Sequence, residues 1–205
     1  QGNTFTDNIC GVYLSAVPGF SIVGNTFAMG RWSEVDMSEN LDELHWQGYH
    51  RGIFTTGGFG FSIQDNTLGL SVPAEAAAPT EGIVVGYSQD HDDIVFRNTA
   101  TGLIRAFVGE GICANVLADE DPGNIGLQFQ CNENFGNATN FMGRKAEGAP
   151  SQELPYHTIR ARQGRIDLAA GNKFDQTGSP VQFDLNTSFA AAPLIFYYYQ
   201  PDSTQ

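Results

Sequence analysis

Apolar residues alternate with polar or small residues over short segments of this chain. Val12 and Leu14 are two residues apart in one such segment, and Ile53 and Thr55 have the same spacing in another. A period of two is typical of β-strands that bury one face. Turn residues follow these segments after a few positions, so the pattern predicts an all-β chain of short strands.

Two of these segments belong to one repeated unit. Residues 11–27 (GVYLSAVPGFSIVGNTF) and 52–68 (GIFTTGGFGFSIQDNTL) share an opening Gly before a β-branched residue, a central GFSI and a closing Asn-Thr pair. In both copies the closing Asn comes 14 positions after the opening Gly. Self-similarity at a fixed spacing is typical of repeat architectures, in which each unit stacks on the next.

Further units match this template less closely, at residues 82–100, 126–141 and 158–174, and residues 102–115 resemble a degenerate unit. No unit is long enough to bury a core alone, so stacking must supply the buried face. We therefore predict an all-β right-handed parallel β-helix, a solenoid of about five to six coils, over residues 1–175.

The pattern changes at the C-terminal end. Residues 176–200 have strand character without the Gly-to-Asn spacing. Because the end of a solenoid must cover its core and strand edges, we predict a cap there and the start of a linker at residues 201–205. The chain opens on a closing element at residues 2–5 (GNTF) without the strand that should precede it, so we expect further coils, or another cover, before residue 1.

An Asn recurs at the closing turn of the units. Such a turn needs a residue with positive φ, which Asn tolerates better than most residues with a side chain. Side-chain amides stacked from coil to coil can also form a ladder of hydrogen bonds. The predicted structural ladder consists of Asn3, Asn25, Asn66, Asn98, Asn140 and Asn172.

Interruptions of the repeat mark insertions near residues 29–51, 114–124 and 143–156. Loops that project from a solenoid commonly carry its binding function. The first insertion is rich in aromatic residues, and its binding candidates are Trp32, Trp46 and Tyr49. These side chains could stack on sugars or dock on a neighbouring module, although packing over the flank of the solenoid explains them more simply.

The charge balance excludes two classes of partner. The chain has 10 Lys and Arg against 23 Asp and Glu, a formal net charge of −13. Nucleic acids and anionic membranes are bound through basic patches, so we expect neither as a partner. Calcium is the one cofactor that the sequence suggests, because Asp119, Glu120 and Asp121 gather carboxylate oxygens in an acidic loop.

Polysaccharide lyases and hydrolases also use the β-helix architecture, so a catalytic groove is the alternative to a structural role. Glycoside hydrolysis needs carboxylates that converge on one groove. The only dense carboxylate group on a coil consists of Asp90, Asp92 and Asp93. Charge runs usually mark solvated turns, so we expect no enzymatic activity and keep these acids as the alternative.

The three cysteines show no metal-ligand spacing. Cys10, Cys113 and Cys131 are an odd number, so at least one thiol is free or pairs with another chain. Buried free thiols and a single Cys113–Cys131 disulfide are both compatible with the sequence. The usual preference of secreted proteins for disulfides slightly favours the bridge.

Several short motifs occur in a recognisable order. They are Gly-Asn-Thr-Phe near the start, GLQFQCN at residues 126–132, AGNKF at residues 170–174 and a final FYYY. In this order they resemble the right-handed parallel β-helix regions of large Bacteroidota surface proteins exported by the type IX secretion system. The likeness covers residues 1–200 apart from the insertions. It implies a long modular protein, secreted or at the cell surface of a Gram-negative bacterium, and it supplies no catalytic residues.

The expected function is therefore a non-catalytic structural and adhesive segment of a long bacterial surface protein. Long solenoids make stiff stalks that carry binding loops. Its expected partners are neighbouring modules of the same chain, together with surface glycans or other cells. The alternative is a carbohydrate-active β-helix, either a polysaccharide lyase or a glycoside hydrolase, with its acids on the groove.

Overall fold

The computed structural model describes most of the predicted repeat. The described residues are 2–30, 49–73, 79–89, 91–114, 125–144, 158–160, 162–165, 168–175, 181–185 and 196–197. This part of the chain contains strands and turns and no helix. The prediction of an all-β chain is therefore confirmed.

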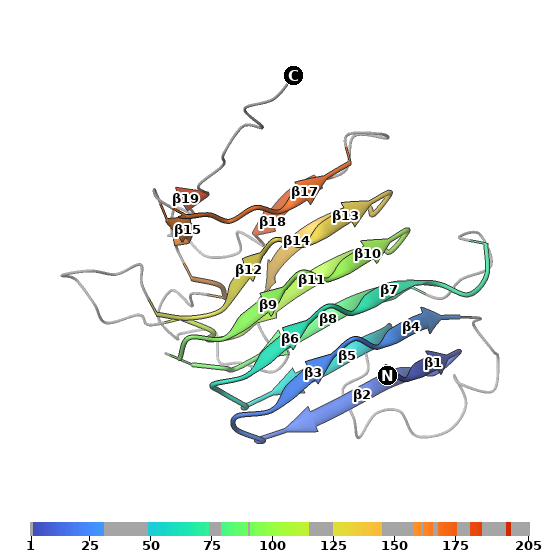
Figure 1. Ribbon diagram of the computed structural model, residues 1–205, viewed down its shortest axis with the longest axis horizontal. Coiled ribbons are helices and arrows are strands. Elements are labelled where there is room, and N and C mark those ends of the chain that lie inside the picture. Colours follow the sequence, from blue (N-terminus) through green and yellow to red (C-terminus); the bar gives the residue numbers. More distant parts are fainter. Residues whose placement is uncertain are drawn as a thin grey trace.

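Most strands belong to three parallel sheets (Figure 1). Sheet A contains, in spatial order, β1 (Thr4–Thr6), β4 (Thr26–Met29), β7 (Thr67–Leu70), β10 (Thr99–Thr101), β13 (Glu133–Phe135) and β17 (Lys173–Phe174). Sheet B contains β2 (Cys10–Ser15), β5 (His50–Thr56), β8 (Thr80–Gly86), β11 (Arg105–Glu110), β14 (Thr139–Arg144) and β18 (Val181–Leu185). Sheet C contains β3 (Ser21–Val23), β6 (Ser62–Gln64), β9 (Ile94–Phe96) and β12 (Gln128–Gln130). A small further sheet joins β15 (Arg162–Arg165) to β16 (Leu168–Ala169) and β19 (Phe196–Tyr197).

The chain passes through sheets B, C and A in turn, and we call one such passage a coil. The strands β2, β3 and β4 form one coil, and β5, β6 and β7 form the next. Figure 1 shows sheets A and B rising in chain order from blue N-terminal strands to red C-terminal ones, while sheet C rises from blue β3 to yellow β12. The arrangement is consistent with a parallel β-solenoid. Its coil count, its handedness and the C-terminal cap stay predictions.

The register keeps equivalent residues next to one another across coils. In sheet B, Ile53 is paired with Ile83, Ile83 with Phe107 and Phe107 with Phe141. These residues point into the solenoid, where the rings of Phe107, Phe129 and Phe141 lie with centroids 5.0–5.8 Å apart. Stacking like on like gives every coil a buried face that it could not form alone.

The repeated Gly at the start of a unit has a steric cause. A Cβ on Gly52 would lie 2.8 Å from the Gly82 carbonyl oxygen and 2.7 Å from Leu68 Cδ2. A Cβ on Gly11 would lie 2.7 Å from the Gly52 carbonyl oxygen. The backbone of the next coil therefore occupies the space that a side chain would need, and Gly permits this approach.

One predicted unit is out of register. Residues 126–141 do not form a coil, because β12 and β13 complete the coil that opens with β11, and β14 opens the following one. Residues 102–115 are thus the start of a full coil and not a degenerate unit. The insertion at residues 114–124 separates β11 from β12, which hid this connection in the sequence.

Candidate functional site

A directional ladder of Asn side chains runs along the turn between sheets C and A. Asn66 Oδ1 accepts hydrogen bonds from the Asn25 backbone N–H at 2.9 Å and from Asn25 Nδ2 at 3.1 Å. Asn98 Oδ1 accepts the same pair from Asn66 at 3.0 and 2.9 Å. The full ladder is Asn3, Asn25, Asn66, Asn98, Asn132 and Asn172. All members except the exposed Asn3 are buried, and side chains that are buried and hydrogen-bonded in this way hold the coils together and are not available to a ligand.

Asn140 is not part of this ladder, contrary to the sequence interpretation. It lies on β14 in sheet B, where its Oδ1 accepts a hydrogen bond from Asn137 Nδ2 at 3.1 Å. Asn132 takes the place that was assigned to Asn140. The distance from the opening Gly misleads here, because insertions between sheets B and C change it. The inward residue of sheet C is the better marker, since the ladder Asn follows three positions after it in each coil, as Asn132 follows Phe129.

The residue with positive φ at this turn is not the Asn. From Asn25 onward, the residue directly before each ladder Asn adopts the left-handed conformation, with φ of 56° at Asp65, 53° at Arg97 and 53° at Cys131. Gly24 and Gly171 occupy the same position in other coils. The Asn is thus required for its hydrogen bonds, and the residue directly before it adopts the strained left-handed backbone conformation of the turn.

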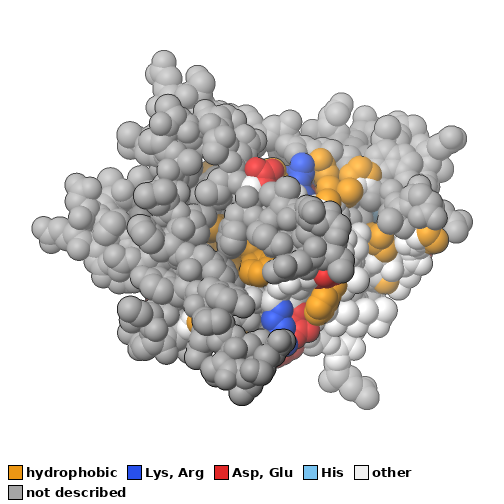
Figure 2. Space-filling model, turned by 90° about the horizontal axis from the view of Figure 1, so that it is seen from above, with side chains coloured by type: hydrophobic (Ala, Val, Ile, Leu, Met, Phe, Trp, Pro, Cys, Tyr) orange, Lys and Arg blue, Asp and Glu red, His pale blue; other side chains and the backbone are white. Residues whose placement is uncertain are grey.

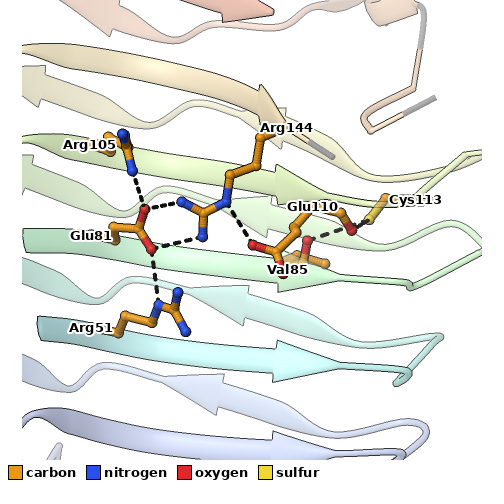
Figure 3. Close-up of polar contacts among 7 residues, drawn as sticks. All are labelled: Arg51, Glu81, Val85, Arg105, Glu110, Cys113 and Arg144. Atoms are coloured by element: carbon orange, nitrogen blue, oxygen red, sulfur yellow. Dashed lines mark hydrogen bonds and ion pairs between the residues drawn. The ribbon is translucent and has the colours of Figure 1, made fainter. Parts of the chain in front are cut away.

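A buried ion cluster lies on the outer face of sheet B (Figure 3). Glu81 is fully buried and accepts hydrogen bonds from Arg51 Nε at 3.0 Å, from Arg105 Nη1 at 2.8 Å and from both terminal nitrogens of Arg144. Arg144 Nε also donates to Glu110 Oε2 at 2.7 Å. Three arginines face two glutamates, and the five residues come from four consecutive strands of the sheet. The cluster therefore ties four coils together.

The protonation of this cluster is set by its members. Burial by itself would raise the pKa of Glu81, but the charge and hydrogen bonds of Arg144, followed by Arg51 and Arg105, outweigh it and lower that pKa. Burial would likewise lower the pKa of Arg144, but Glu81 and Glu110 raise it. Glu81 is thus held ionised, which makes it a structural anion and a poor proton acceptor.

Two of the candidate catalytic acids, Asp92 and Asp93, face different surroundings. Asp90 lies outside the described residues. The Asp92 side chain is 66% exposed and lies 3.7 Å from Arg160 Nη1. Asp93 is fully buried, and its Oδ1 accepts a hydrogen bond from the Phe61 N–H at 3.2 Å. One carboxylate therefore faces solvent and the other faces the core, which is not the paired arrangement that glycoside hydrolysis requires.

Of the three aromatic candidates for binding, only Tyr49 lies within the described residues. Trp32 and Trp46 lie outside the described residues, as do the calcium candidates Asp119, Glu120 and Asp121. The ring of Tyr49 lies against Arg105, whose guanidinium carbon is 4.6 Å from the ring centroid. Tyr49 therefore packs on the buried ion cluster, which agrees with a role in covering the flank. Among the described residues, no group of three or more His, Cys, Asp or Glu is placed to hold a metal ion.

Of the two alternatives for the cysteines, the structure has free thiols at Cys10, Cys113 and Cys131. Cys113 is buried, and its thiol hydrogen-bonds to the carbonyl oxygens of Val85 and Glu110, both at 3.4 Å (Figure 3). Cys131 lies at the turn before Asn132. Cys113 lies at the corner between sheets B and C, and Cys131 lies at the corner between sheets C and A.

On the face shown in Figure 2, the acidic and basic side chains of the described residues lie next to each other. No helix in the described part of the chain is long and apolar enough to cross a membrane. Comparisons with protein-family models, with curated proteins and with solved structures found no match. The geometry of the coils is therefore the basis for the function proposed below.

Proposed function

We propose that this chain is a non-catalytic structural segment, a stiff stalk that carries binding loops. The observation that supports this best is the Asn ladder, whose hydrogen bonds pass from coil to coil beside three parallel sheets. The Glu81 cluster adds a second tie across four coils. Both features resist separation of the coils along the axis, which is what a stalk under tension needs.

Pulling a single molecule between marker domains of known unfolding force tests the stalk. We expect the coils to resist at least as much force as the markers, and the Asn66→Ala variant to yield at a lower force. Asn3→Ala is the matched control, because Asn3 stands at the end of the ladder and contributes one side-chain hydrogen bond. Coils that extend at forces far below the markers, with or without Asn66, would contradict the proposal.

A screen for activity tests the absence of catalysis. The chain is incubated with acidic and neutral polysaccharides, and the products are measured as reducing ends or as the absorbance of unsaturated sugars. We expect no product above the level of a heat-denatured sample. Product formation that disappears in Asp92→Asn would establish the alternative, a carbohydrate-active enzyme.

We also propose, on the family resemblance alone, that the parent protein reaches the outside of a Gram-negative cell through the type IX system. Its adhesive contacts would then be with neighbouring modules, surface glycans or other cells. Protease treatment of intact source cells, with antibody detection of this segment, tests the location. A segment that is degraded only after lysis would overturn the surface assignment.

A further inference from the structure

Asp93 occupies a position that the neighbouring coils fill with apolar side chains. The register pairs Ile94 with Ser62 on one side and with Gln128 on the other. The residues just before these three, Phe61, Asp93 and Leu127, are therefore neighbours in one column. Phe61 and Leu127 belong to the hydrophobic core, and Asp93 is 0% exposed. A carboxyl group thus lies in an apolar column inside the solenoid.

The hydrogen bonding of Asp93 is incomplete. Its Oδ1 accepts the Phe61 N–H, while its Oδ2 is buried without a hydrogen-bond partner. Ser88 Oγ is buried without a hydrogen-bond partner as well; its proximity, like the backbone at Phe61 and Gly60, lowers the pKa of Asp93, but burial outweighs these effects. An ionised carboxylate can accept about four hydrogen bonds, so the charged form is poorly compensated here. The neutral form would add a donor beside the Ser88 oxygen.

The surroundings contain little positive charge for Asp93. On its own turn, the charge of His91 lowers the pKa of Asp93, but this effect is smaller than that of burial. From the corner between β11 and β12, the Cys113 thiol faces it, and burial raises the pKa of that thiol to about 11. The β6 side presents only the backbone at Phe61 and Gly60. Of the nearby acids, Asp92 is directed toward Arg160, and Glu110 is directed toward Arg144, which it shares with Glu81.

We propose that Asp93 is a proton-controlled latch at the corner between β8 and β9: its neutral form closes the corner, and loss of the proton opens the corner locally. Burial raises the pKa of Asp93 to about 6, so the change falls between about pH 4 and pH 7. Since the folded form holds its proton more tightly than the unfolded form, the closed corner is favoured at low pH and weakened as pH rises. The latch depends on the fold alone and not on the proposed stalk function.

Amide hydrogen exchange tests the latch, because the Phe61 N–H bonds directly to Asp93. Rates are measured from pH 4 to pH 8, corrected for intrinsic exchange, and compared with the Thr99 N–H, which bonds to Asn66 O at 2.9 Å. We expect the relative protection of Phe61 to fall by up to about 100-fold over this range. Asp93→Asn should remove the pH dependence, and Asp92→Asn should keep it. The same pH dependence in Asp93→Asn, or none in the native chain, would overturn the proposal.

A second measurement serves if Asp93→Asn does not fold. The side-chain carboxyl of Asp93 is followed in the native chain by carbon NMR as pH is varied. A midpoint near 6 supports the latch. A midpoint at or below about 4.5, in the ordinary range for an aspartate, overturns it.

Discussion

Replacing one central rung of the Asn ladder should destabilise the solenoid more than replacing its end. Asn66→Ala removes two hydrogen bonds that Asn66 Oδ1 accepts from Asn25. It also removes two that Asn66 Nδ2 donates, to Ile22 O at 3.0 Å and to Asn98 Oδ1 at 2.9 Å. All four are buried, so no water replaces the lost partner of the Asn25 N–H.

The magnitude follows from these four bonds. A buried hydrogen bond contributes about 1 kcal/mol, and an orphaned buried donor costs about 1–3 kcal/mol. We therefore expect Asn66→Ala to lower the free energy of unfolding by about 4 kcal/mol. Asn3→Ala loses only the bond from Asn3 Nδ2 to Asn25 Oδ1, at a partly buried site, so it should cost at most about 1 kcal/mol.

Urea denaturation followed by far-UV circular dichroism measures both variants. Because repeat proteins can unfold in parts, the slope of the transition must match that of the native chain before midpoints are compared. Equal decreases in the free energy of unfolding for Asn66→Ala and Asn3→Ala would refute the reasoning, since they would show that the loss of stability does not depend on the number of ladder hydrogen bonds removed. A loss below about 1 kcal/mol for Asn66→Ala would refute it too.

Three further predictions concern single residues. Glu81→Gln should lower the free energy of unfolding by about 3–5 kcal/mol in the same urea assay, because three arginines then share a buried site without its central anion. The control is Asp65→Asn at an exposed ion pair, which should lower the free energy of unfolding by at most about 1 kcal/mol. Cys131→Gly should raise the free energy of unfolding by about 0.5–1 kcal/mol, because the backbone at residue 131 has a φ of 53°, which Gly adopts without the steric cost of a side chain. A lower free energy of unfolding in this variant would contradict the assignment of backbone strain to Cys131. Cys113 should resist alkylation in the folded chain and react after denaturation, because it is buried and burial raises the pKa of its thiol to about 11. Mass spectrometry of the modified peptide measures the extent of alkylation. Rapid alkylation of Cys113 in the folded chain would contradict the prediction.

The strands and the inward columns could be predicted from sequence because apolar residues with a period of two report directly on burial. The register of the repeat was predictable only where no insertion intervened. Gly52 and Asn66 keep the spacing of Gly11 and Asn25, but the coil that opens with β11 reaches its ladder residue, Asn132, only after an insertion. A count that begins at the inward residue of sheet C avoids this error.

The Glu81 cluster was missed because its members are far apart in the sequence and each looks like an ordinary surface charge. One signal was present, since Arg51, Glu81 and Arg105 each stand directly before the position of the repeated Gly, which is Gly52, Gly82 and Ala106 in these coils. Opposite charges at equivalent positions of stacked units become neighbours once the register is known. The contribution of Arg144 could not be found in this way, because it comes from the other end of its strand.

The two buried carboxylates should limit stability at opposite ends of the pH range. The lowered pKa of Glu81 means that its stabilisation is present above about pH 4.3 and is lost as pH falls through the folded pKa. The pKa of Asp93, raised to about 6, gives stabilisation that is complete below about pH 3.9 and is lost as pH rises through 6. A rise from about 3.9 to about 6 corresponds to about 3 kcal/mol.

Urea titrations of the native chain and two variants, repeated from pH 3 to pH 8, separate these contributions. Asp93→Asn should match the native chain near pH 4 and exceed its stability by about 3 kcal/mol at pH 7. Glu81→Gln should instead show its largest deficit at neutral pH and approach the native chain at low pH. A stability difference between Asp93→Asn and the native chain that does not change with pH would mean that Asp93 titrates alike in the folded and unfolded states. The corner between β8 and β9 would then be an ordinary turn.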